Sequence, residues 1–203
     1  MLLSINPIDP QGRLIEKAAK ILGDGGVIAY PTDTIYGIGC NIFNKKAIER
    51  VYQLKQKDRR VPLSFICPNL KDISNYAHIT TPNYKIMRHF LPGPYTFILR
   101  GTRLVPKLML AKRRTVGIRI PDNKICLSLL EKFGSPIVST SATTQNDEEI
   151  LNDPIDIEEQ LGKCLDLVID GGISGLTAST VVDLTVDPPN VLRVGKGDPS
   201  YFE

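Results

Sequence analysis

Apolar residues along the chain follow two spacings, and these alternate from one end of the chain to the other. Stripes with an apolar residue at every third or fourth position predict helices, and capping residues, prolines or glycines bound each stripe. The helices expected on this basis span about residues 9–23, 44–54, 81–91, 124–133 and 153–162. Short apolar runs predict strands, and these cover residues 27–30, 62–67, 95–99, 116–120, a run after Pro136, 165–169, 180–184 and 191–194.

The first helix is expected to begin at Asp9-Pro10, where an N-cap residue precedes a first-turn proline, and to end at Gly23. Helices and strands then interleave without a linker or a change in composition long enough to separate two domains. The sequence therefore predicts a single α/β domain with a mixed sheet, spanning residues 1–203.

Several strands end in the same way, in residues with hydroxyl or basic side chains. The segments are "VIAYPTDT", "RRTVGIRIP", "PIVSTSATT" and, approached from the other side, "GLTASTVVDL". In open α/β sheets, ligands bind beside strand ends, where loop N–H groups and short side chains can be aimed at them. One such serine or threonine is more often a turn former. Four segments together indicate a pocket for oxyanions and a small polar substrate.

The composition argues against several classes of protein. The sequence has four dispersed cysteines and two histidines: Cys40, Cys67, Cys126, Cys164, His78 and His89. This set forms no CxxC pair, so we expect reduced thiols, no protein-built metal site and no catalytic Cys/His or Ser/His/Asp group. No apolar run reaches membrane-spanning length and the N-terminus lacks a signal-peptide pattern. We therefore expect a cytoplasmic protein without a membrane partner.

Charge is distributed unevenly along the chain. The net charge is +3, yet residues 50–119 hold 15 Lys or Arg against two acids, Asp58 and Asp72, a local balance of +13. Acidic residues crowd instead between Asp147 and Glu159. Two interpretations stay open: a solvated basic face, or a surface for polyanions such as nucleotide phosphates or RNA.

Seven segments, in order, resemble the YrdC/YciO family. They are "YPTDTIYGIG", "IERVYQLKQKDRRVPLSF", "LPGPYTFIL", "TVGIRIP", "IVSTSA", "STVVDL" and "VLRVGKG". The resemblance runs from the first helix to about Arg193. It implies a YrdC-like fold with its core at about residues 8–198: a twisted mixed β-sheet flanked by helices, with a basic concave face.

The resemblance implies an activity, because full members of this family make threonylcarbamoyl-AMP for the tRNA modification threonylcarbamoyladenosine. The substrates would be L-threonine, bicarbonate and ATP, the last together with Mg²⁺ because triphosphate chemistry usually needs it. N-carboxylated threonine would attack the α-phosphorus and release pyrophosphate. Such a nucleotidyltransferase needs no protein nucleophile, so no catalytic residue is expected beyond groups that position anions and stabilise charge.

The same resemblance assigns residues to the two substrates. Positions that would bind threonine are Thr32, Thr34, Arg119 and Ser139. Positions that would bind the nucleotide are Lys55, Lys57, Arg59, Thr115, Ser141, Thr143, Ser179 and Arg193. Arg119 would pair with the threonine carboxylate, which suits a planar two-pronged donor. Asp33 is expected to brace the loop.

Two motifs depart from the synthase pattern and resemble the YciO branch. The family's KxRP reads Lys55-Gln56-Lys57-Asp58 here, and SxN reads Ser141-Ala142-Thr143. A lysine in place of arginine keeps the positive charge but loses the planar guanidinium, which can bind two phosphate oxygens at once.

The departures favour a second interpretation, a protein that binds double-stranded RNA or tRNA and has a vestigial nucleotide site. Its RNA-binding residues would be Lys55, Lys57, Arg59, Arg60, Lys112, Arg113 and Arg114. Other tRNA-modification proteins are expected partners in either case. A third interpretation is a carbamoyl-transfer relative, which is weaker because such domains normally belong to much longer chains.

Overall fold

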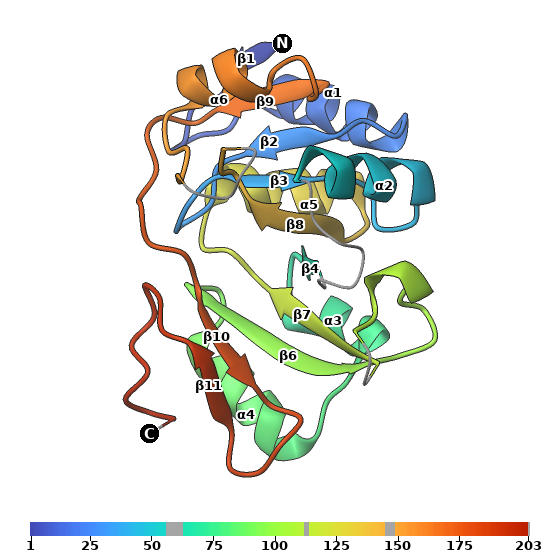
Figure 1. The fold of residues 1–203 in the computed structure, drawn as a ribbon, viewed down its shortest axis with the longest axis vertical. Coiled ribbons are helices and arrows are strands. Elements are labelled where there is room, and N and C mark those ends of the chain that lie inside the picture. Colours follow the sequence, from blue (N-terminus) through green and yellow to red (C-terminus); the bar gives the residue numbers. More distant parts are fainter. Residues whose placement is uncertain (56–62, 112–113, 145–148, 203) are drawn as a thin grey trace.

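The computed structural model of the protein describes residues 1–55, 63–111, 114–144 and 149–202 (Figure 1). The helices are α1 (Gly12–Gly23), α2 (Lys45–Leu54), α3 (Leu70–Tyr76), α4 (Thr81–Phe90), α5 (Lys124–Phe133) and α6 (Pro154–Leu161), with a 3-10 turn η1 at Lys107–Met109. The strands are β1 (Leu2–Ser4), β2 (Ile28–Tyr30), β3 (Gly37–Gly39), β4 (Ser64–Ile66), β5 (Ala77–His78), β6 (Tyr95–Gly101), β7 (Thr115–Arg119), β8 (Ile137–Ser141), β9 (Leu167–Asp170), β10 (Thr180–Asp183) and β11 (Asn190–Arg193).

The strands form one mixed sheet in the order β1-β9-β2-β3-β8-β4-β7-β6-β10-β11, and β5 pairs with β6. The pairs β2/β9, β4/β7 and β6/β10 are parallel, whereas β2/β3, β3/β8, β4/β8 and β6/β7 are antiparallel. In Figure 1 the order runs from β1 at the top to β10 and β11 at the bottom. The expected α/β fold with a central mixed sheet is thus confirmed; the assignment of all 203 residues to one domain stays a prediction.

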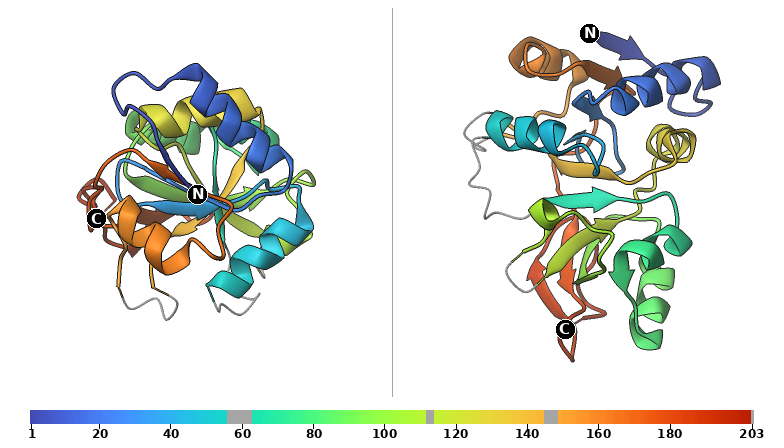
Figure 2. Two further views of the ribbon diagram at one scale, coloured as in Figure 1. Left: turned by 90° about the horizontal axis from the view of Figure 1, so that it is seen from above. Right: turned by 90° about the vertical axis from the view of Figure 1, so that its right-hand side faces the viewer.

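Helices flank the sheet unevenly. Figure 2 shows α1, α5, α3 and α4 on one side of the molecule, and α2 and α6 on the other side, beside the upper strands. On β6 and β7, Phe97, Leu99, Val116 and Ile118 join the core cluster that includes α3 and α4 residues such as Met87. Side chains alternate along a strand, so the opposite face of these two strands points away from α3 and α4.

A second core lies beneath α1 and α5. Leu22 and Leu129 are fully buried there against Tyr30 and Leu167 of the sheet. Each buried side chain of this size contributes roughly 1.5–3 kcal/mol, which holds the two helices over strands β2, β8 and β9. This core fixes the upper strands whose ends form part of the candidate site.

Local capping explains most helix boundaries. Asn44 accepts a hydrogen bond from Ala47 N (3.0 Å) at the start of α2, and Asn123 accepts one from Cys126 N (3.0 Å) at the start of α5. Gly134 ends α5 with φ +72°, a conformation that glycine adopts without strain. The ends of α5 match the sequence-based prediction.

The predicted start of α1 is wrong. The helix begins at Gly12, and Gln11 rather than Asp9 precedes it. Asn6 Oδ1 accepts hydrogen bonds from Ile8 N (2.8 Å) and Asp9 N (3.1 Å), so residues 6–9 form a turn of their own. That local turn competes with the helix for the same backbone groups.

The sequence analysis also missed α3, β1, β3 and β5. The most informative omission is β3, whose sequence is Gly-Ile-Gly. A Cβ atom at Gly39 would lie 1.9 Å from Val138 O, and one at Gly37 would lie 2.8 Å from the Tyr30 ring. Glycine is therefore required by close packing between strands, although it weakens the alternating pattern by which strands are recognised.

Among the described residues, none of the helices is long and apolar enough to cross a membrane.

Candidate functional site

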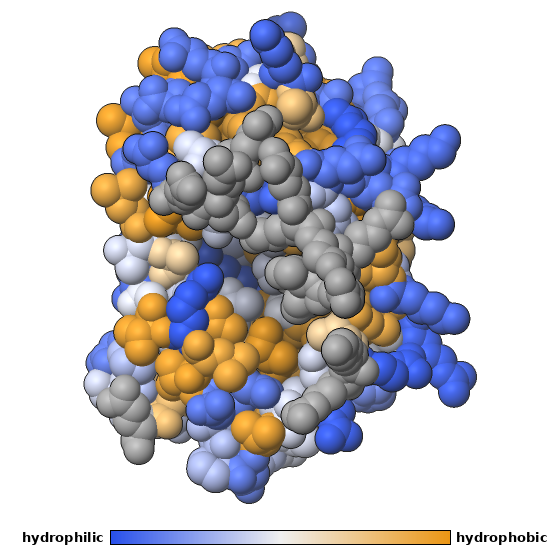
Figure 3. Space-filling view, viewed as in Figure 1, coloured by the Kyte–Doolittle hydropathy of each residue, from blue (hydrophilic) through white to orange (hydrophobic). Residues whose placement is uncertain are grey.

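The strand ends singled out in the sequence meet at one small cavity, which we call the strand-end pocket. It is lined by Thr32, Thr34, Ile35, Tyr36, Gly37, Arg119, Ser139, Thr140, Ser141, Ala178, Ser179 and Arg193. Its volume is about 50 Å³, room for one or two waters at roughly 30 Å³ each. A larger ligand can enter only if lining side chains move. Figure 3 shows the face of the molecule seen in Figure 1, hollowed near its middle, where hydrophilic residues are exposed.

Alternation along β6 and β7 brings polar residues to this side of the sheet. Thr115, Gly117 and Arg119 occupy every second position of β7, on the face opposite Val116 and Ile118. The paired positions are Ile98 opposite Gly117 and Arg100 opposite Thr115. The face of β6 and β7 that α3 and α4 do not cover therefore carries hydroxyl and guanidinium groups.

The loop after β2 is held by its own hydroxyl groups. Thr32 Oγ1 donates to Ile35 O (2.6 Å) and accepts from Thr34 N (3.1 Å), which closes a tight turn. Both threonines are buried, Thr34 completely. Thr32 therefore contributes to the bracing of this loop, and Thr32 and Thr34 both line the strand-end pocket.

Arg119 is held by three partners. Its Nη1 donates to Thr34 Oγ1 (2.7 Å), its Nε donates to Gly93 O (3.3 Å), and its Nη2 forms an ion pair with the Asp33 carboxylate. The side chains of Arg119 and Asp33 are 10% and 12% exposed. A guanidinium has more N–H donors than these bonds use, so Arg119 can still donate to an anionic ligand. The ion pair between Asp33 and Arg119 joins the loop after β2 to β7, which agrees with the bracing role expected for Asp33.

Arg193 and Ser179 form the opposite wall. Arg193 donates to Ser179 O from Nη2 (2.8 Å) and from Nε (3.2 Å), and Ser179 Oγ lies 2.8 Å from Thr96 Oγ1. Burial, and then the positive charge of Arg119, lower the pKa of the Arg193 guanidinium. Two arginines thus face one cavity, an arrangement that an anion between them would stabilise.

Two further residues are connected with the site and were not singled out from the sequence: Tyr36 lines the strand-end pocket, and Lys196 contacts the loop after β2. Tyr36 OH donates to Gly172 O (2.8 Å) and accepts from Gly171 N (3.1 Å). Burial raises the pKa of Tyr36 to about 12, so the hydroxyl stays neutral. Lys196 Nζ donates to Asp33 O (2.5 Å), which joins the C-terminal segment to the loop after β2. The only signal for Lys196 was its place in "VLRVGKG".

The two motifs that depart from the synthase pattern meet each other. Lys55, at the end of α2, is 2% exposed, and its Nζ donates to Thr143 Oγ1. Neither residue lines the strand-end pocket. Lys55 is thus buried in this structure, and its expected roles in nucleotide and RNA binding stay predictions.

The other expected site residues fall into two groups. Thr115 and Arg114 lie at the far end of β7 from Arg119 and border a different cavity, so the structure does not bring Thr115 to the strand-end pocket. The remaining ones lie outside the described residues: Lys57, Arg59, Arg60, Lys112 and Arg113.

The cysteines and acidic residues give no sign of a metal centre within the part of the chain that the structure describes. There, no group of three or more His, Cys, Asp or Glu residues is placed to hold an ion. Cys40, Cys67 and Cys126 are buried and unpaired. Burial raises the pKa of all three thiols, that of Cys40 to about 12, so they stay protonated and unreactive near neutral pH.

Residues 20–195 match the Sua5/YciO/YrdC family, which carries the description "Telomere recombination". The chain belongs to this family. Escherichia coli YciO, an uncharacterised protein, is 42% identical over 98% of this chain and 97% of its own length. The crystal structure of E. coli YciO covers 100% of this chain and 99% of its own, with a TM-score of 0.96. The YciO-like character expected from the altered motifs is confirmed.

The family also includes threonylcarbamoyl-AMP synthases. The synthase of Mus musculus is 34% identical over 85% of this chain, which spans 63% of the mouse protein. The structure of P. abyssi Sua5 complexed with L-threonine has a TM-score of 0.90 and 28% identity, over 96% of this chain and 57% of Sua5. Members of the family thus include synthases that are longer than this chain and YciO proteins of nearly the same length.

Proposed function

We propose that this protein is a threonylcarbamoyl-AMP synthase or a close relative, acting on L-threonine, bicarbonate and ATP in the cytoplasm. The observation that carries the proposal is the strand-end pocket, in which Arg119 and Arg193 face one cavity together with threonine and serine hydroxyls. The structural likeness to Sua5 complexed with L-threonine supports the same substrate class.

Arg119 would bind the carboxylate of L-threonine. It is buried, and its contacts with Gly93 O and Thr34 Oγ1 fix the orientation of the guanidinium. A carboxylate suits the remaining N–H groups, because two parallel N–H···O bonds match its geometry. The hydroxyl groups of Thr32, Thr34 and Ser139 would then contact the amino acid's polar groups.

The reaction would proceed without a protein nucleophile. The threonine nitrogen first attacks bicarbonate and water leaves, giving N-carboxythreonine. A carbamate oxygen then attacks the α-phosphorus of ATP: a P–O bond forms to this oxygen, and the bond to pyrophosphate breaks. The chain's contribution would be the placement of two anions and the stabilisation of spreading negative charge by Arg119 and Arg193.

A pyrophosphate-release assay with ATP, Mg²⁺, bicarbonate and each amino acid in turn tests the proposal. We expect release that requires bicarbonate and is fastest with L-threonine. Arg119→Lys should raise the KM for threonine about tenfold or more, because a point charge replaces a fork, whereas Arg13→Lys on the exposed face of α1 serves as a matched control. Release without any amino-acid dependence, or an unchanged threonine KM in Arg119→Lys, would contradict the proposal.

RNA binding is a second candidate function, with double-stranded RNA or tRNA as the ligand and other tRNA-modification proteins as further partners. The observation that favours it is the excess of basic residues between residues 50 and 119, where 15 Lys or Arg stand against two acidic residues. Phosphate contacts of this kind make affinity fall steeply with salt. Filter binding of tRNA over a salt series tests it, and an affinity independent of salt would exclude it.

A further inference from the structure

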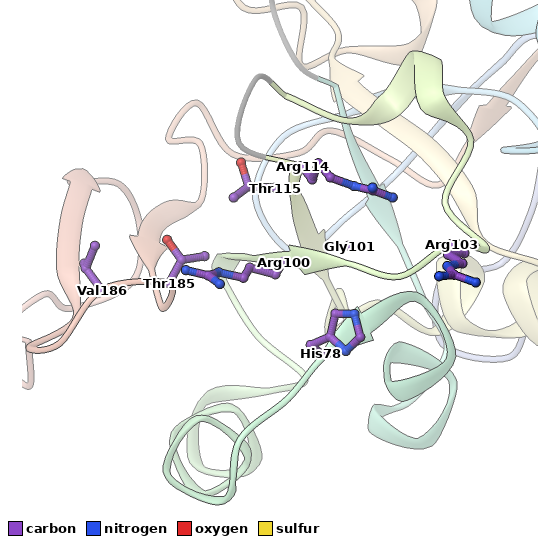
Figure 4. Close-up of a pocket in the computed structure, with 8 residues that line it drawn as sticks. All are labelled: His78, Arg100, Gly101, Arg103, Arg114, Thr115, Thr185 and Val186. Carbon is purple, nitrogen blue, oxygen red and sulfur yellow. The ribbon is translucent and has the colours of Figure 1, made fainter.

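A second and larger cavity lies at the far end of β7 from Arg119; we call it the basic pocket. Its volume is about 680 Å³, and it is lined by His78, Arg100, Gly101, Arg103, Arg114, Thr115, Thr185 and Val186. Figure 4 shows that these residues come from β5, β6 and the turn after it, the start of β7 with the residue before it, and the turn after β10. The lining has no residue in common with the strand-end pocket.

The positive charge of the basic pocket is not neutralised by the described residues. Arg100, Arg103 and Arg114 are exposed, and in the described part of the chain none of them forms an ion pair. No carboxylate is among the described residues that line the cavity. Asp183 lies two residues before Thr185, which lines the cavity, and its carboxylate accepts hydrogen bonds from Thr185 N (2.8 Å) and Thr185 Oγ1 (2.6 Å). An anion from outside the chain would therefore meet guanidinium groups without an internal competitor among the lining residues.

The sheet places the backbone positions of three lining residues side by side. His78 pairs with Arg100 across β5 and β6, and Arg100 pairs with Thr115 across β6 and β7. Paired residues of neighbouring strands share a face and lie about 5 Å apart. Figure 4 shows Arg100 extending from β6 towards Thr185, while Arg114 extends from the start of β7 in the opposite direction in this view.

The backbone at Arg114 is held in a conformation that few non-glycine residues adopt. Its φ is +57°, in the left-handed region. Arg114 N donates to Ala111 O (2.8 Å), and Arg114 O accepts from Gly101 N (2.8 Å), so the chain is bonded on both sides of the residue. These bonds fix the point from which the Arg114 side chain reaches the pocket.

We propose that the basic pocket binds phosphate groups, separately from the strand-end pocket. Arginine forks suit phosphate oxygens, and a cavity of this volume accepts more than a single phosphate. The phosphates can come from an RNA backbone or from a free polyphosphate, and the two sources share the chemistry that the arginines recognise. Only the RNA source rests on the second candidate function above.

The two sites lie on the same face of β7. Thr115 and Arg119 are four residues apart on one strand, a separation of about 13 Å at roughly 3.3 Å per residue. The two pockets share no lining residue, so a variant in one leaves the lining side chains of the other unchanged. Failure of phosphate binding would consequently leave the proposed synthase site untouched, and the reverse also holds.

The test uses the full-length protein with two probes: inorganic tripolyphosphate followed by calorimetry, and a short labelled RNA duplex followed by fluorescence anisotropy over a salt series. The variant Arg100→Gln with Arg114→Gln removes two guanidinium groups. Arg13→Gln with Lys17→Gln is the matched control, because these two basic residues are exposed on α1, lie outside residues 50–119, and make the same change in net charge. Circular dichroism and thermal melting verify that both variants fold.

We expect the pocket variant to weaken tripolyphosphate binding about tenfold or more, with little change in the control. Its RNA affinity should fall too, and the slope of log K against log salt should become shallower by about two, roughly one per lost phosphate contact. Loss of tripolyphosphate binding alone, with no RNA binding by the unaltered protein, supports a polyphosphate pocket and excludes the RNA source. Equal binding by pocket and control variants, with both probes, overturns the proposal.

Discussion

The two ends of β7 present arginine side chains in opposite ways. Arg119 is buried and bonded to Asp33, Thr34 and Gly93, whereas Arg100 and Arg114 are exposed and have no ion pair within the described residues. A buried guanidinium has lost its hydration, so it must keep fixed partners. An exposed one stays hydrated and available. The buried end should therefore select ligands by geometry, and the exposed end by charge.

The largest expected effect is the loss of stability in Arg119→Met. Removal of the guanidinium leaves the Asp33 carboxylate buried and without its cation, which costs about 3–5 kcal/mol for an ion pair at this depth. Urea unfolding followed by circular dichroism measures the change in the free energy of unfolding. Adding Asp33→Asn should recover part of the loss.

Arg13→Met is the comparison for this variant, since Arg13 is exposed on α1 and should change stability by less than about 0.5 kcal/mol. An Arg119→Met protein as stable as the Arg13→Met protein would show that the ion pair does not hold the loop after β2.

Repair of the two altered motifs should have the next largest effect. Lys57→Arg with Asp58→Pro and Thr143→Asn restores the synthase residues, and we expect adenylate formation to rise about a hundredfold, as for one restored transition-state donor. The amide oxygen introduced by Thr143→Asn can still accept from Lys55, which preserves the contact between the two motifs. Pyrophosphate release at saturating threonine measures the gain. A repaired protein that remains inactive would show that the pocket serves another ligand.

Asp33→Asn separates the role of the carboxylate from that of the guanidinium. The amide oxygen can still accept from Arg119 Nη2, but the negative charge that repels a substrate carboxylate is gone. We expect L-threonine to bind about tenfold more tightly, equivalent to roughly 1.4 kcal/mol. Calorimetry with L-threoninamide, which has no carboxylate, provides the control and should show no gain. Weaker threonine binding in Asp33→Asn would mean that Asp33 contacts the ligand directly.

Arg103→Gln should have the smallest effect, and only at the exposed end. One lost phosphate contact makes the salt slope of RNA affinity shallower by about one, while the KM for threonine stays unchanged. Anisotropy with labelled RNA gives the slope, and the pyrophosphate assay gives the KM. A changed KM with an unchanged slope would reverse the assignment of the two ends.

Local features of this fold could be predicted from the sequence, because the signals are local. The helices predicted over residues 44–54 and 124–133 are found there, bounded by Asn44, Asn123 and Gly134, since a cap needs only its neighbouring residues. Gly37 and Gly39 gave the opposite result: their strand is defined by contacts with Tyr30 and Val138 rather than by its own pattern.

The site was predictable as a set of residues but not as a network. Thr32, Thr34, Arg119, Ser139, Ser141, Ser179 and Arg193 gather at one cavity, as the motifs indicated. The contacts between Lys196 and Asp33, and between Lys55 and Thr143, join residues 163 and 88 positions apart. The spacing of residues along the chain does not predict such contacts, because they depend on the twist of the sheet and on the order of its strands.

The pairing of early strands with late ones has a consequence for synthesis on the ribosome. β2 lies beside β9, β6 lies beside β10, and Lys196 reaches back to Asp33. Chains emerge from the N-terminus, so the loop that holds Thr32 and Thr34 has all of its neighbours only after synthesis has passed Lys196. Long-range pairing of this kind also slows folding. A nascent or truncated chain that lacks β9 to β11 would therefore have the "TDT" loop without the walls of its pocket, and substrate binding would report that these later strands have been added.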